Sequence, residues 1–152
     1  MQATNTKALH DAFVAAIRGT MPRYEYLSSS TWHHSPQARD TELEGAATRN
    51  FYLTMSPAQP NEMFFGQGQS YETQLRIYTS YSFVDPAHLD HMITQDGIDL
   101  WQTFESLYDP STPGLYSCEP VGADIDGADV DEQGNVTLAH VFRVVFNQDL
   151  GD

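Results

Sequence analysis

Residues 70–110, "SYETQLRIYTSYSFVDPAHLDHMITQDGIDLWQTFESLYDP", decide the fold because the spacing of their apolar side chains changes once, near residue 85. In residues 70–84 large apolar and polar side chains alternate. Such alternation predicts a β-strand with one buried face and one solvent-facing side. The apolar members of the buried face are Leu75, Ile77, Tyr81 and Phe83.

From residue 85 the apolar side chains recur with the period of an α-helix, so residues 85–110 predict an amphipathic helix. Asp85 is suited to cap its first amides, and Pro86 fits the first helical position, where its missing N–H is not needed. The predicted buried stripe consists of Leu89, Met92, Ile93, Leu100, Phe104 and Leu107.

Two further segments lie before this pair. Residues 6–18 place Leu9, Phe13 and Ile17 on one helical face, with Gly19 directly after them. Thr4 or Thr6 is expected to cap this helix. Residues 49–55, "RNFYLTM", place Phe51, Leu53 and Met55 on one face of a strand.

Two strands are expected after the long helix, on either side of an acidic segment. The last one contains "VTLAHVFRVVFN" (136–147). The order of the elements predicts a single α+β domain over residues 1–152, with a mixed or antiparallel β-sheet and about two α-helices packed on one face. Residues 20–47 and 56–70 are expected to form long loops.

The chain is strongly acidic, with 21 Asp and Glu residues against 7 Lys and Arg residues and a formal net charge of -14. Proteins that grip a phosphate backbone use clustered Lys and Arg, so direct nucleic-acid binding is not expected. Cys118 is the only cysteine, which excludes a disulfide within the chain and suits a reducing compartment. No apolar stretch approaches the ~18 residues of a membrane span, so a soluble intracellular protein is expected.

The segment "DIDGADVDEQGNV" (124–136) resembles a calcium loop at first sight. Counted from Asp129, however, His140 stands where an EF-hand has its bidentate Glu, and a strand follows instead of a helix. An acidic turn between two strands is therefore favoured over a weak cation site at Asp129 and Asp131. The acids of the segment are Asp124, Asp126, Asp129, Asp131 and Glu132.

No nucleophile, phosphate-binding or zinc motif occurs in the sequence, so no catalytic residue, metal ligand or cofactor is predicted. His88 and His91, three residues apart in the predicted helix, are an unspecific alternative pair of metal ligands.

Apolar side chains also occur where the two helices are not expected to cover them. Met63, Phe64 and Phe65 interrupt a Pro- and Gly-rich connection, where they either anchor the loop in the core or contact a neighbouring protein. Val141 and Val145 lie on the second face of the last strand. These five residues are the predicted interface with a partner.

"RNFYLTM", "QLRIYTSYSFVDP", "LDHMITQDGIDLWQTFESLYDP" and "VTLAHVFRVVFN" together resemble, in order and texture, the tail terminator (tail-completion or neck) proteins of long-tailed bacteriophages. The resemblance covers most of residues 6–147, while residues 20–47 match no part of the family pattern. It implies a non-enzymatic structural virion protein without a cofactor. It further implies a homohexameric ring at the head-proximal end of the viral tail tube, which ends tube growth and joins tail to head.

The partners implied by the resemblance are further copies of the chain, the tail tube protein and a neck or head-completion protein. Phage DNA would pass through the acidic ring without specific binding, and assembly in the host cytoplasm would precede incorporation into the virion. A head-side neck or tail-completion adaptor is the neighbouring alternative. A small cation-dependent binding or hydrolytic domain, using residues 124–136 or the pair His88 and His91, is the alternative from another class.

Overall fold

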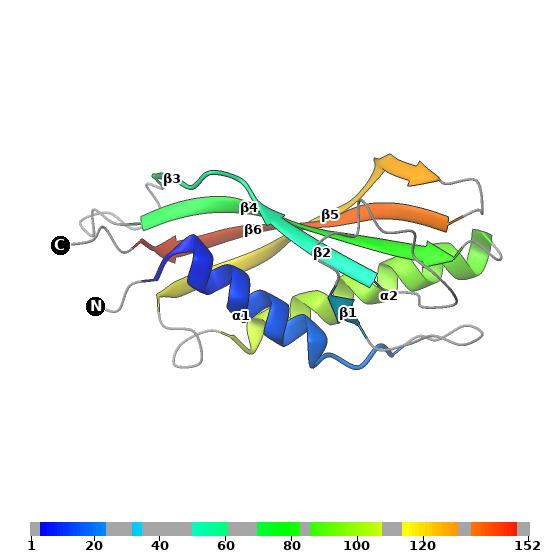
Figure 1. Cartoon of the computed structure of the whole chain (residues 1–152), viewed down its shortest axis with the longest axis horizontal. Helices are drawn as coiled ribbons and strands as arrows, with labels where there is room; N and C mark the ends of the chain where they lie inside the picture. The colour runs from blue at the N-terminus through cyan, green and yellow to red at the C-terminus, as the bar shows by residue number, and fades with distance from the viewer. Residues whose placement is uncertain are drawn as a thin grey trace.

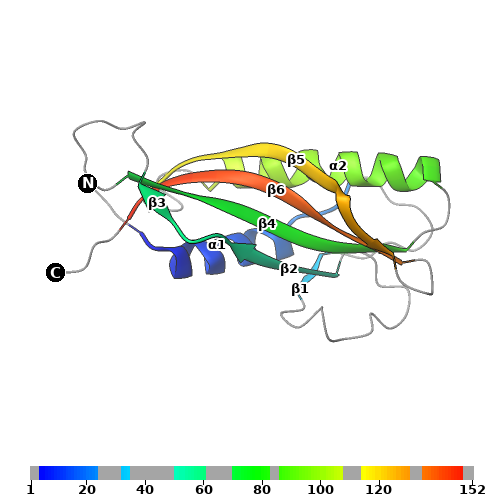
Figure 2. The same cartoon turned by 90° about the horizontal axis from the view of Figure 1, so that it is seen from above.

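The computed structural model describes residues 4–23, 32–34, 50–60, 70–82, 86–107, 114–130 and 135–148. Their elements are α1 (Thr6–Arg18), β1 (His33–His34), β2 (Asn50–Met55), β3 (Gln59–Pro60), β4 (Ser70–Ser82), α2 (Pro86–Glu105), β5 (Leu115–Val130) and β6 (Asn135–Asn147). The sheet has the strand order β1-β2-β4-β6-β5, and β3 pairs with β4 beside this path. Only β1 and β2 pair in parallel; the other pairs are antiparallel. The predicted α+β fold with a mixed sheet is confirmed, and both helices lie on one face of the sheet (Figure 1; Figure 2).

The long strand predicted from residues 70–84 is β4, and it lies in the middle of the sheet. It pairs with β6 in an unbroken ladder from Ser70 opposite Asn147 to Ser82 opposite Asn135. Leu75, Ile77 and Tyr81 are fully buried, as their alternation predicted. Phe83 and the expected cap Asp85 lie outside the described residues.

Helix α1 has the predicted bounds, but its N-cap is Asn5 and not Thr4 or Thr6. The Asn5 side chain accepts a hydrogen bond of 2.8 Å from the amide of Ala8. Thr4 instead donates its amide to the carbonyl of Asn147, 2.8 Å away, which binds the start of the described chain to the end of β6. This extra sheet contact places Thr4 outside the helix.

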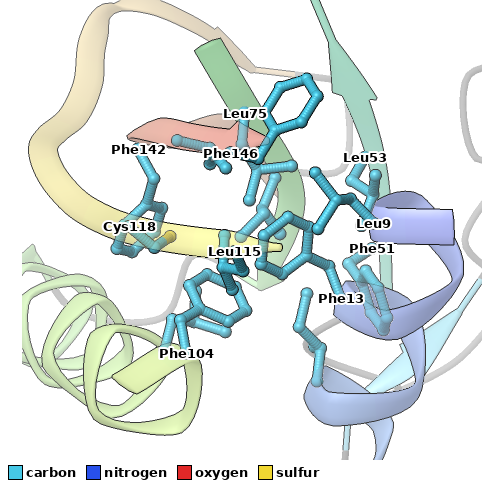
Figure 3. Packing of buried hydrophobic residues seen from close by; sticks show 14 of the residues in the cluster. Leu9, Phe13, Phe51, Leu53, Leu75, Phe104, Leu115, Cys118, Phe142 and Phe146 are labelled. Carbon is cyan, nitrogen blue, oxygen red and sulfur yellow. The ribbon is translucent and has the colours of Figure 1, made fainter. Parts of the chain in front are cut away.

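The core lies between the helices and the sheet, where aromatic rings from distant segments meet (Figure 3). Phe104 of α2 is central to it. Its ring centroid lies 5.0 Å from that of Phe13 on α1 and 5.0 Å from that of Phe142 on β6, both in edge-to-face geometry. Such pairs add to the free energy of area burial. They fix both helices over the same face of the sheet.

The predicted long loops are in part described. Within residues 20–47 the two residues of β1 form a short parallel pair with β2, and within residues 56–70 β3 pairs with β4. Residues 24–31, 35–49 and 61–69 lie outside the described part of the chain. Among the residues that are described, neither helix combines the length and apolar character required to cross a bilayer.

Candidate functional site between helix α2 and strand β5

A pocket of about 620 Å³ lies between α2 and β5. Its volume falls within the range of small-molecule sites, about 300–1,000 Å³. The lining is mainly apolar, and its apolar side chains are those of Ile93, Ile98, Trp101, Pro120, Ala123, Ile125 and Val141. The side chains of Asp90 and Thr94 add polar groups from α2. Ile98 and Trp101 remain well exposed, which is unusual for large apolar residues beside a core.

The pocket reaches His140 of β6, which belongs to a buried polar network. The hydroxyl of Tyr81 donates to the Asp96 carboxylate over 2.9 Å and lies 2.8 Å from Nε2 of His140. All three residues are buried. Because the single hydroxyl proton of Tyr81 goes to Asp96, Nε2 of His140 must carry a proton and donate it to Tyr81. Nδ1 is then the unprotonated nitrogen and an acceptor.

The environment keeps the His140 ring neutral at pH 7. Burial disfavours the charged form and lowers the pKa of His140 from 6.5 to about 4. The described residues offer Nδ1 no hydrogen-bond partner. A Cβ atom placed on Gly97 would lie 3.5 Å from Nδ1, so this nitrogen faces the one position of α2 that has no side chain.

A second hollow, of about 500 Å³, lies between the end of α1 and α2. Its buried acid, Asp99, accepts hydrogen bonds from the Arg23 amide at 3.1 Å, from Arg23 Nε at 2.5 Å and from Gln95 Nε2 at 3.1 Å. These contacts fasten the segment after α1 to α2. Because the Asp99 carboxylate already accepts these hydrogen bonds, we interpret the hollow as a structural junction between the end of α1 and α2.

The acidic segment is organised differently from the prediction. Residues 124–130 are part of strand β5 and not of a turn, and Val130 pairs with Val136 of β6. The antiparallel pairing agrees with the predicted strands on either side of the segment, while its start at residue 124 is wrong, and residues 131–134 lie outside the described part of the chain. The side chain of Asp124 accepts a hydrogen bond of 3.1 Å from Arg76 Nη1.

The other acids of the segment cannot be placed as ligands. Asp126 and Asp129 belong to the backbone of β5, and Asp131 and Glu132 lie outside the described residues. Within the described part of the chain, no three His, Cys, Asp or Glu side chains are arranged to hold a metal ion. The alternative pair His88 and His91 lies in the first turns of α2.

The predicted interface residues fall into two groups. Val141 and Val145 are buried within the single chain, with 5% and 0% of their surfaces exposed, and Val141 also lines the pocket between α2 and β5. The register sets them opposite Arg76 and Glu72, whose long side chains can cover small neighbours on an open sheet face. The expectation that these valines expose apolar surface is therefore wrong. The predicted interface residues Met63, Phe64 and Phe65 lie outside the described residues.

The exposed apolar side chains are found elsewhere. Val121 and Ile125 of β5 are 63% and 64% exposed, and Met21 after α1 is 70% exposed. The sequence interpretation did not single out these residues. The signal of Val121 and Ile125 was weak because isolated apolar residues in a Gly- and Asp-rich segment are compatible with a turn.

A comparison with models of known protein families finds no match, and a comparison with curated proteins finds none either.

Proposed function

We propose that the chain is a non-enzymatic structural subunit that forms a ring, of six copies, at the head-proximal end of a bacteriophage tail tube. In this role it ends tube growth and joins the tail to the neck of the head. The sequence resemblance supplies the identity of the assembly. The order of elements on which that resemblance rests is the order that the described residues have.

The observation that carries a self-assembling role is the exposed edge of the sheet. Strand β5 pairs only with β6 among the described strands, and it projects Val121 and Ile125 into solvent. Fully burying a branched aliphatic side chain is worth about 1.5–3 kcal/mol. Contact with a neighbouring subunit at this edge would recover that free energy at every interface of a ring.

Natural edge strands usually carry features that prevent uncontrolled pairing. Strand β5 has such features, because Pro120 lacks an N–H and the register shifts between Pro120 and Gly122 and again between Asp124 and Asp129. An irregular edge accepts only a partner of matching shape. This supports a specific subunit contact through side chains over open-ended strand addition.

A ring needs two different contact surfaces on each subunit. The opposite edge of the sheet is formed by β2 with the short β1, so the two edges differ in sequence and length. A head-to-tail contact between unlike edges closes into a ring when its rotation permits. The net charge of -14 on each subunit would give such a ring a wall that repels phosphates, which suits passage of DNA without binding.

The test is the oligomeric state of the purified chain, measured by light scattering after size exclusion and by electron microscopy. The wild type is expected to form closed rings. The double variant Val121→Lys, Ile125→Lys is expected to be monomeric, because desolvating two ammonium groups opposes the contact. The matched control Met21→Lys changes an equally exposed apolar residue away from β5 and should leave the rings intact.

A wild-type protein that stays monomeric at all concentrations would contradict the ring. Rings that persist in the β5 double variant would contradict the contact at this edge. Far-UV circular dichroism confirms that each variant is folded. Addition of the chain to polymerising tail tube protein then tests the role itself, because a terminator is expected to shorten the tubes.

A further inference from the structure

We propose that the α2–β5 pocket is a binding site for a small neutral aromatic molecule that carries one hydrogen-bond donor, such as a phenol or an indole. Nδ1 of His140 accepts the hydrogen bond from this donor. This inference does not depend on the proposed ring, since it rests on the polar floor and apolar walls of one chain.

The floor of the pocket is a fixed acceptor. Only 3% of the surface of His140 is exposed, and the 2.8 Å contact between Nε2 and the Tyr81 hydroxyl sets its orientation. Nδ1 makes no hydrogen bond to the described residues, and His140 lines the pocket, so this nitrogen is open to a donor that enters there.

Gly97 shapes the access to this acceptor. It lies next to the imidazole, and any side chain there would begin 3.5 Å from Nδ1. A glycine inside a helix costs about 1 kcal/mol relative to alanine. A glycine at this position leaves room for a ligand atom beside the imidazole, which accounts for its presence inside the helix.

The walls select the rest of the ligand. Ile93, Ile98 and Trp101 on α2 face Pro120 and Ala123 on β5 across the pocket. Apolar walls with one polar group at depth are typical of sites for small, largely apolar ligands. The indole of Trp101 favours a flat ring, because aromatic pairs gain free energy beyond their area.

Charge excludes the main alternatives. A carboxylate or phosphate would meet a neutral imidazole at the floor, the Asp90 carboxylate in the lining and a net charge of -14 around it. None of these stabilises an anion. A neutral donor such as a phenolic O–H makes the hydrogen bond without a desolvated charge.

The test compares two probes of nearly equal shape, 4-fluorophenol and fluorobenzene, by ¹⁹F NMR titration of the purified wild-type chain. Only the phenol can donate to Nδ1. A net hydrogen bond contributes about 0.5–1.5 kcal/mol, so 4-fluorophenol is expected to bind roughly two- to thirteen-fold more tightly. ¹⁵N NMR should show the His140 Nδ1 resonance as an unprotonated nitrogen that moves upfield when the phenol is added.

Gly97→Ala is the informative variant, because it suits a helix and places a methyl group beside Nδ1. It is expected to weaken 4-fluorophenol binding about ten-fold or more and to abolish the preference over fluorobenzene. Gln102→Ala, an exposed change on α2 outside the pocket lining, is the matched control and should bind like the wild type.

Equal affinity for the two probes, absence of saturable binding, a protonated Nδ1, or unchanged phenol binding by Gly97→Ala would each overturn the proposal. None of these readouts measures ring formation. Failure of the ligand site and failure of the ring are therefore separate results.

Discussion

The buried imidazole of His140 makes the stability of the chain depend on pH in a defined window. The pKa of His140 is lowered from 6.5 to about 4 by burial. Between these values the unfolded chain binds a proton at this residue and the folded chain does not. Stability is therefore fully present above pH 6.5 and falls as the pH decreases toward 4, by about 3 kcal/mol in total from this residue.

The assay is urea unfolding of the wild type and of His140→Gln at about pH 7.5 and about pH 5, where His140 alone accounts for a loss of about 2 kcal/mol. The glutamine amide can still donate to Tyr81 but does not titrate. The stability difference between wild type and variant should therefore shrink by about 2 kcal/mol on going to the lower pH. Tyr81, which contacts the imidazole, and Asp96, which is bonded to Tyr81, are titratable groups that both proteins retain.

Parallel pH profiles for the two proteins would refute this reasoning. The direct measurement is the ring proton resonance of His140, which should not titrate above about pH 5. A normal titration near pH 6.5 would show that the imidazole is accessible to water in the native state. That result would remove both the stability effect and the fixed acceptor at the pocket floor.

Two further predictions concern the core. Phe104→Ala removes a ring that contacts both Phe13 and Phe142. In urea titrations this change is expected to lower the free energy of unfolding by about 3–5 kcal/mol. A loss below about 1 kcal/mol would show that this junction is loosely packed. Cys118 is buried, and its pKa is raised, mainly by desolvation. The thiol should therefore resist a water-soluble disulfide reagent in native buffer and react fully in denaturant. A rapid reaction of the thiol in native buffer would contradict its burial.

The regular elements could be predicted because their side chains follow one period without interruption. The alternation through β4 and the stripe of α2 each contain enough apolar residues to fix which face is buried. Leu89, Met92, Ile93, Leu100 and Phe104 are buried, as the helical period predicted. Hydrophobic burial dominates the free energy of folding, so such patterns are the most reliable part of a sequence.

The candidate site was missed because polar residues occupy buried positions within those same patterns. Asp96 lies three residues after Ile93 and four before Leu100, on the apolar stripe of α2. His140 alternates with Leu138 and Phe142 on the buried face of β6. Both positions could have been recognised as polar groups that need a partner inside the core. The identity of the partner, Tyr81, depends on the pairing of β4 with β6, which the local sequence does not specify.

The extent of β5 was missed for a different reason. Asp and Gly disfavour strands, so the sequence from residue 124 predicts a turn, but pairing with the strongly apolar β6 extends the strand to Val130. In this segment the pairing of β5 with β6 outweighs the low strand propensity of Asp and Gly, and the resulting strand is irregular. Gly122 has a φ of 128°, which other residues rarely adopt, and the ladder shifts register on either side of it.

This irregular stretch connects the two proposals. Bulges redirect side chains and bend a strand away from its partner, and they recur next to functional sites. Pro120, Gly122 and Ile125 of the irregular stretch line the pocket against α2, while Val121 and Ile125 expose their side chains at the sheet edge. A regular strand would alternate these residues strictly between the two faces and would continue the ladder with β6. We infer that the departure from regular pairing in β5, at a cost in strand stability, is retained because it forms both surfaces. Gly122→Ala should then perturb ring formation and phenol binding together, although a Cβ atom at this position would meet no atom within 4 Å.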